Sequence, residues 1–165
     1  MSRLALLALA ITVLAFAAAA GFFYAYSISV MVGLDAAPAK AAIEAMQGIN
    51  REVTNVWFAL SFFGAPLYAL IALLLCLLTK NRAAAAWVFM AFAIYMSGTF
   101  GVTVSQNVPR NEALALVNAT DTSADLETIW TTYSSQWTAW NHIRTLSSLA
   151  AVLFTALAFR AAKPA

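Results

Sequence analysis

The sequence has 165 residues, of which 63% are hydrophobic and only 10% are charged. Soluble domains carry about 25% charged residues, so this composition excludes an ordinary soluble domain and indicates an integral membrane protein with one domain over residues 1–165. The net charge of +2 comes without a basic run, and a single cysteine cannot form a disulfide within the chain, which excludes nucleic-acid binding and a disulfide-stabilised scaffold.

Four apolar stretches are long enough to cross a bilayer, which takes about 20 residues in a helix. The predicted spans are residues 4–34, 55–79, 83–106 and 137–160. The first stretch is longer than the apolar core of a signal peptide, which has about 7–15 residues, so we expect it to stay as a membrane helix. The predicted fold class is all-α: an integral membrane four-helix bundle with extramembrane helical loops covering one end.

The two longer connections, residues 35–54 and 107–136, are more polar than the spans. In the first, Pro38 is expected to open an amphipathic helix that lies on the membrane surface or over the bundle. In the second, Pro109 is expected to end the third span, and a short helix is expected over residues 111–119.

A helix of roughly 35 residues is expected from about Leu126 to Arg160, and its length would be about 50 Å. The hydrocarbon core of a bilayer is only about 30 Å thick. The first part of this helix should therefore project beyond the core.

Basic residues near the ends of spans indicate the orientation of the chain. On one side the topology places Arg3, Lys80, Arg82, Arg160 and Lys163. On the other it places Lys40, Arg51, Arg110 and Arg144 together with all seven acidic residues, so the clearest signal is the short turn Lys80-Asn-Arg82, which has no acid. The short basic turn predicts that this turn and both termini lie in the cytoplasm. Both longer loops would then face the outside of what we expect to be a bacterial inner membrane.

Some residues inside the spans are expected to shape the bundle. Pro66 should kink the second span and free a backbone carbonyl. Thr99, Thr103 and Asn107 are four residues apart and share one face, which predicts hydrogen bonds between helices or contact with a ligand. Small residues allow close helix approach, so Gly98 and Gly101 would fit a contact within the bundle or in a homo-oligomer.

One face of the last helix collects aromatic and polar residues when positions are projected at about 100° per residue. This stripe consists of Trp130, Tyr133, Trp137, Trp140, Asn141, Arg144 and Ser148. An arginine at the depth of a span is costly unless it is paired or faces a cavity, so the stripe should point into the protein. His142 falls off the stripe. Tyr24 and Ser27 at the outer end of the first span either face the same site or bond to a neighbour.

Several segments resemble the anthrone oxygenase family of small four-helix membrane proteins. They are residues 21–27 with Met31 and residues 33–34, residues 45–50, residues 107–111, and Trp137-x-x-Trp140-Asn-x-x-Arg144. The resemblance covers nearly the whole chain. It implies the oxidation of an anthrone to an anthraquinone, a monooxygenase reaction with O₂ as co-substrate and no recruited cofactor.

The chain departs from the fungal enzymes of that family at one position. In those enzymes the residue three before the arginine is a histidine, whereas here it is Asn141 and the only histidine follows at 142. Because asparagine cannot act as a general base, the candidates for the proton acceptor are Glu112 and His142.

The implied substrate is a small hydrophobic aromatic molecule, a flat phenolic compound whose enolate needs donors or a cation at its oxygen. The side chains expected to supply that stabilisation are Arg144, Asn141, Asn107 and Asn111. The side chains expected to bind the ring system are Trp137, Trp140, Tyr133, Trp130, Tyr24, Ser27, Gln47 and Asn50.

Other interpretations stay open at this point. In a non-catalytic binding or scaffold protein, Arg144 would anchor the loop at 107–111, and the outermost aromatic residues would form an interfacial belt. A transporter is disfavoured because the chain has no internal repeat and no intramembrane charge pair. One histidine, the lone Cys76 and no paired carboxylates in the spans give no metal site, although a haem held through His142 stays an alternative.

Overall fold

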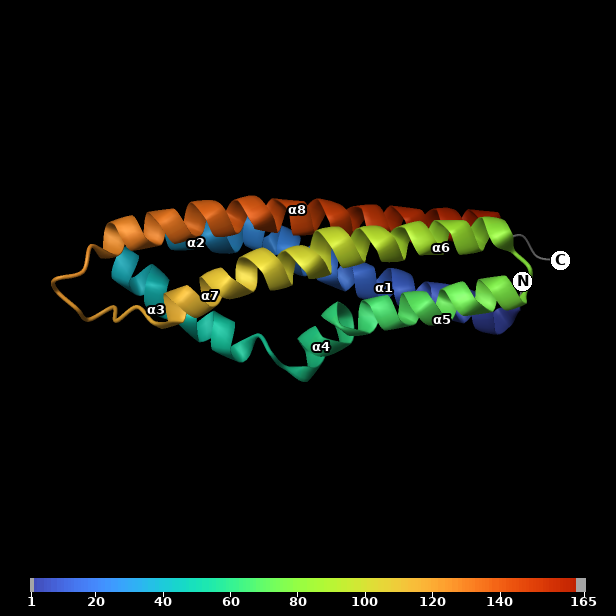
Figure 1. Cartoon of the computed structure of the whole chain (residues 1–165), viewed down its shortest axis with the longest axis horizontal. Helices are drawn as coiled ribbons and strands as arrows, with labels where there is room; N and C mark the ends of the chain where they lie inside the picture. Colours follow the sequence, from blue (N-terminus) through green and yellow to red (C-terminus); the bar gives the residue numbers. More distant parts are fainter. Residues whose placement is uncertain (1, 163–165) are drawn as a thin grey trace.

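The computed structural model describes residues 2–162, and within that range it is helical without strands. Four helical units are long and apolar enough to cross a membrane: Arg3–Asp35, Val56–Leu78, Arg82–Ala115 and Leu126–Ala161. They run antiparallel along the long axis of the molecule (Figure 1). The prediction of an all-α membrane four-helix bundle is confirmed.

Most of the units are built from several helical segments. These segments are α1 (Arg3–Ala25), η1 (Tyr26–Val30), α2 (Met31–Asp35), α3 (Ala39–Glu52), α4 (Val56–Phe62), α5 (Gly64–Leu78), α6 (Arg82–Ile94), η2 (Tyr95–Gly101), η3 (Thr103–Asn107), α7 (Val108–Ala115) and α8 (Leu126–Ala161). The three segments labelled η are π-helical. Helices α1 and α6 each pack against both α5 and α8.

The core of the bundle is rich in small residues. Ala8, Ala69, Ala91 and Ala151 belong to one buried cluster with Cys76. In a membrane the hydrophobic effect does not drive helices together, because lipid tails are as apolar as the side chains. Small side chains instead let the helix backbones approach closely and gain dispersion contacts. The lone cysteine is therefore a packing residue of the core.

The second span breaks three residues before Pro66, at Phe63, which separates α4 from α5. Proline has no N–H to donate to the carbonyl four residues earlier, which belongs to Phe62. The buried Tyr95 hydroxyl donates to that carbonyl at 3.0 Å. The freed carbonyl expected from the sequence is thus satisfied by a neighbouring helix.

The prediction that Pro109 ends the third span, with a separate helix over 111–119, is wrong. The helix continues from η3 directly into α7 and ends at Ala115. Pro109 lies in the first turn of α7, after a π-helical segment whose hydrogen bonds reach five residues back. A proline is tolerated inside a membrane helix where local π-helical adjustments satisfy the freed backbone groups.

The end of the molecule opposite the termini is covered by α3, α7 and the first turns of α8 (Figure 1). On α3, Ile43 and Met46 are buried in a second apolar cluster with Trp130 of α8. The Gln47 amide nitrogen donates to the carbonyls of Leu114 and Val117, both at 2.9 Å. These contacts fasten α3 over the bundle, as expected for an amphipathic helix.

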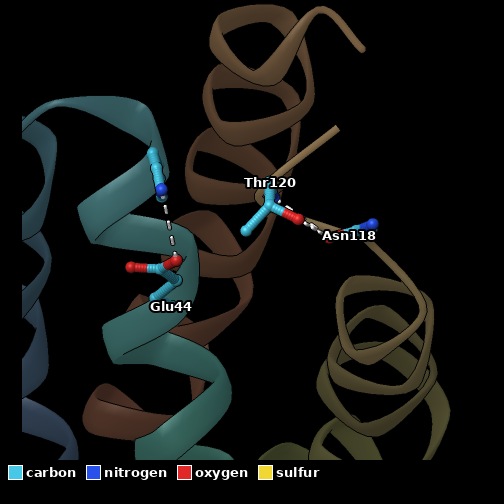
Figure 2. Close-up of polar contacts among 4 residues, drawn as sticks. Glu44, Asn118 and Thr120 are labelled. Atoms are coloured by element: carbon cyan, nitrogen blue, oxygen red, sulfur yellow. Dashed lines mark hydrogen bonds and ion pairs between the residues drawn. The ribbon is translucent and has the colours of Figure 1, made fainter. Parts of the chain in front are cut away.

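Figure 2 shows two polar contacts at this end that stay within single segments. Thr120 donates its hydroxyl hydrogen to Asn118 Oδ1 at 2.8 Å, and Glu44 forms an ion pair with Lys40 at 4.0 Å. Exposed pairs of this kind contribute little to stability. The attachment of α3 therefore rests on its buried face and on Gln47.

The N-terminus, the C-terminus and the turn between α5 and α6 lie at one end of the bundle (Figure 1). Arg3, Lys80, Arg82 and Arg160 are consequently at the same end, as the topology predicted. Lys163 lies outside the described residues. Which end faces the cytoplasm stays a prediction.

We predict that Gly98→Ala lowers the melting temperature of the protein. A Cβ at Gly98 would collide with the side chain of Ser147 on α8, and overpacking of this kind costs about 1–3 kcal/mol. Thermal unfolding in detergent measures the effect. Gly33→Ala is the matched control, since nothing lies within 4 Å of a Cβ there; equal melting temperatures of the two variants would contradict the prediction. Gly98 therefore provides the close helix approach within the bundle, to α8.

Candidate functional site

A cavity of about 500 Å³ lies between the parts of α1 and α4 far from the termini, the η3–α7 segment and α8, with α3 along one side. Its volume is within the range of about 300–1,000 Å³ that is typical of small-molecule sites. Much of the wall is aromatic: Phe22, Phe23, Tyr26, Phe58, Phe62, Phe63 and Trp137. The polar part of the wall consists of Gln47, Asn50, Thr103, Asn111 and Arg144, with Arg51, Thr54 and Glu112.

Arg144 brings a positive charge to this wall, and its side chain is only 4% exposed. Its guanidinium carbon lies 4.4 Å from the ring centre of Phe23 and 4.7 Å from that of Trp137. No carboxylate among residues 2–162 forms an ion pair with it. The cation is therefore surrounded by aromatic faces and lacks a counter-ion in the described part of the chain.

The hydrogen bonds of Arg144 use only part of its donor capacity. Nη2 donates to Asn141 Oδ1 at 2.8 Å, Nη1 makes a long contact of 3.4 Å to Thr103 Oγ1, and Nε has no partner among the described residues. A guanidinium has five N–H groups. Arg144 can thus donate to an oxygen atom placed in the cavity.

Asn141 holds Arg144 through a chain of hydrogen bonds whose direction the arginine sets. Since Arg144 can only donate, Asn141 Oδ1 must accept, and Asn141 Nδ2 donates to the Phe23 carbonyl (2.7 Å) and to Ser27 Oγ (2.8 Å). Ser27 Oγ also lies 3.0 Å from His142 Nδ1. His142 is exposed and off the stripe, yet two hydrogen bonds connect it to Asn141 through Ser27.

Trp137 is held by two asparagines. Asn111 Oδ1 accepts hydrogen bonds from Trp137 Nε1 and from the Tyr133 hydroxyl, both at 2.9 Å. Asn107 Nδ2 donates to the Trp137 carbonyl at 3.1 Å. Because Oδ1 of Asn111 accepts both bonds, its Nδ2 group stays available on a residue that lines the cavity.

The inward orientation predicted for the stripe on α8 is confirmed for all its members except Trp140, which is partly exposed. Of the predicted site residues, the cavity wall contains Arg144, Asn111, Trp137, Gln47 and Asn50. A layer behind the wall supports these through hydrogen bonds and consists of Asn141, Asn107, Tyr133 and Ser27.

Three residues predicted to bind the ring system are not at the cavity. Tyr24 is 50% exposed, because it points away from the inward face of α1 that carries Phe16 and Phe23. Trp130 donates its Nε1 hydrogen to Asp35 at 3.0 Å and packs under α3. Trp140 lies at the edge of the stripe. None of the three lines this cavity.

The sequence analysis missed Tyr26 and the phenylalanines of α1 and α4 as parts of the wall, and it left Thr103 open between interhelical hydrogen bonds and contact with a ligand. The sequence has eleven phenylalanines among many other apolar residues, so composition cannot distinguish a phenylalanine of the core from one at a cavity wall. Tyr26 and Thr103 are in π-helical segments, where positions projected at 100° per residue drift from their true direction. The only available signal was the adjacency of Phe22 and Phe23 to Tyr26.

Two further expectations concern Arg144 and metals. Arg144 makes no hydrogen bond to a carbonyl of residues 107–111; Asn107 provides the contact between that segment and α8. Within residues 2–162 no group of three or more His, Cys, Asp or Glu side chains could hold a metal ion. Glu112 lies at the cavity wall and is exposed, which leaves it in place as the candidate proton acceptor.

The family model of anthrone oxygenase matches residues 55–154. The chain belongs to the anthrone oxygenase family. No curated protein and no solved structure matches the chain. The matched region contains Asn111, Trp137, Asn141 and Arg144, whereas the parts of the cavity wall on α1 and α3 precede it.

We predict that Asn141→Ala destabilises the protein, because it leaves a buried guanidinium N–H without an acceptor and removes two bonds to the first span. Stranding a buried partner costs about 1–3 kcal/mol. Thermal unfolding in lipid nanodiscs measures the loss. The control is Asn118→Ala, at an exposed asparagine whose side chain accepts hydrogen bonds only from Thr120, two residues away. If both variants melt at the wild-type temperature, the hydrogen bonds of Asn141 do not contribute to stability and the prediction is wrong.

Proposed function

We propose that this membrane protein oxidises a flat, hydrophobic phenolic or quinone-precursor molecule with O₂ in the cavity beside Arg144. The observation that carries the proposal is the buried guanidinium, which has no counter-ion in residues 2–162 and has unused donors at the wall of an aromatic cavity. Membership in the anthrone oxygenase family supports the same class of substrate.

The first step is the loss of a proton from the CH₂ group of an anthrone-like substrate, which gives an enolate with its charge on oxygen. Arg144 and the Nδ2 group of Asn111 are the donors proposed to stabilise that oxygen, as in an oxyanion hole. Phe23, Trp137 and the phenylalanines of α4 would hold the ring system. Glu112 is proposed to take the proton, since it lies at the exposed part of the wall.

The oxidation then needs no reductant other than the substrate. The enolate passes an electron to O₂, and the two radicals combine at carbon to a peroxide, which regains a proton. Loss of the second hydrogen of the CH₂ carbon as a proton and cleavage of the O–O bond then give the ketone and water. In sum, CH₂ and O₂ become C=O and H₂O. The proposal therefore uses O₂ as co-substrate and no recruited cofactor.

The second candidate is non-catalytic binding of the same kind of molecule, since the cavity and the cation would serve a binding protein equally well. We further propose that the protein lies in a bacterial inner membrane with the cavity on the outer side, because the basic turn and both termini share the opposite end. Turnover separates the two candidate functions.

We predict that wild-type protein in nanodiscs accelerates O₂ uptake by anthrone over empty nanodiscs, and that Arg144→Gln lowers the rate constant kcat by about 10²–10³-fold. That is the effect expected for the loss of an oxyanion donor. An oxygen electrode and the absorbance of the quinone measure the rate. Arg144→Lys, which keeps the charge without the fork of donors, should retain part of the activity.

The matched control is Arg110→Gln. Arg110 bonds to Gln106 and Gln136 and does not line the cavity, so this variant should keep wild-type turnover. An Arg144→Gln variant as active as the control would overturn the proposal. A wild-type protein that binds anthrone without consuming O₂ would establish the non-catalytic alternative.

A further inference from the structure

A second cavity of about 500 Å³ adjoins the first. The two share part of their walls: Phe22, Tyr26, Ile49, Val53 and Phe58. The first cavity extends from these residues to α7 and α8, and the second extends the other way, between α1 and α4. Only side chains and the non-helical linker at residues 53–55 separate the two spaces.

The second cavity opens on the side of the bundle that faces lipid. Ala18, Trp57 and Ser61 line it without lining the first cavity, and all three belong to candidate membrane spans. Glu52 and Asn55 also line it, at the linker before the second span. The Trp57 side chain is 79% exposed, and Ala18 is also exposed. An opening framed by such residues within two spans gives access to the hydrocarbon region or its outer boundary.

The first cavity has a different mouth. Its exposed wall residues at the outer end include Arg51, Thr54 and Glu112. Charged side chains stay in contact with water. The joined cavities thus have one opening among charged residues beside α7. The second opening, on the other side of the shared wall, extends from Glu52 and Asn55 to Ala18, Trp57 and Ser61 within two spans.

The shared wall is made of groups that can move without breaking hydrogen bonds. The ring centres of Phe22 and Phe58 are 5.2 Å apart, and those of Phe22 and Tyr26 are 4.9 Å apart. Phe22 and Phe58 are only partly buried, and side-chain rotations of exposed residues take picoseconds to nanoseconds. A change of rotamer at Phe22 or Phe58 would join the two spaces.

We propose that the apolar substrate of the cavity at Arg144 enters sideways from the outer leaflet through the second cavity, between Ala18 of α1 and Trp57 and Ser61 of α4. The inference rests on the proposed function, which requires a flat phenolic molecule that dissolves in lipid. Such a molecule reaches a lipid-facing opening without crossing water, whereas the mouth at Arg51 and Glu112 would require it to leave the bilayer. That mouth serves water and the released proton.

The test compares leucine substitutions at two adjacent, exposed alanines of α1. Ala18→Leu narrows the second cavity, and Ala17→Leu is the matched control because Ala17 lines none of the described cavities. The probe is 1-hydroxyanthraquinone dissolved in the bilayer of the nanodisc, which is a product-like phenol that needs no O₂. Stopped-flow quenching of tryptophan fluorescence gives the association and dissociation rate constants.

Ala18→Leu is expected to slow association and dissociation by a similar factor, of about tenfold, so that Kd changes less than about twofold. Ala17→Leu should match the wild type. A narrowed entry route must lower the association and dissociation rate constants by the same factor. A distorted binding site would mainly raise the dissociation rate constant. Unchanged association in Ala18→Leu, or a loss of affinity at an unchanged association rate, would overturn the lateral route.

A further variant tests the polar mouth directly. Ala115→Leu fills part of that mouth, and slower association in this variant but not in Ala18→Leu would assign entry to the aqueous side. If the wild-type protein binds the probe normally while Ala18→Leu behaves like Ala17→Leu, only the route fails. If the wild-type protein binds no probe from the bilayer, the proposed function fails together with the route.

Discussion

The burial of the Arg144 guanidinium is the constraint on which the site depends. At the depth of a membrane span, a cation is costly unless other groups replace its water. No carboxylate of residues 2–162 does so; the faces of Phe23 and Trp137 and the oxygens of Asn141 and Thr103 do. This surrounding holds the cation in place while leaving donors unused, which is the state in which it can bind an oxyanion.

Other polar side chains in the half of the bundle far from the termini connect the helices around that cation. Asn141 bonds to the Phe23 carbonyl of α1, Thr99 to the Arg144 carbonyl of α8, and Asn107 to the Trp137 carbonyl of α8. The three π-helical segments lie in the same part of the two spans that face α8. π-Helical turns are frequent at functional sites, and here they set the directions of Tyr26 and Thr103 toward the cavity.

The match to the family model covers one part of the cavity wall and not the other. Arg144, Asn111 and Trp137 lie inside the matched residues 55–154, and they form the cation, the donor and the aromatic face proposed for the reaction. Phe22, Tyr26 and Gln47 lie before the matched region, on the walls that shape the space. The side chains proposed to stabilise charge therefore lie in the matched region, and the walls from α1 and α3 lie before it.

The sequence by itself determined the four spans, the stripe on α8 and the carbonyl freed by Pro66, because these follow from hydropathy, helical period and the missing N–H of proline. Only the tertiary structure decided which residues line the cavity. In the structure Tyr26 lines the cavity and Tyr24 does not, and Trp130 bonds to Asp35. The third span continues past Pro109. The reason is physical: π-helical turns change the direction of side chains without a compositional signal, and a phenylalanine has the same character in a core as at a cavity wall.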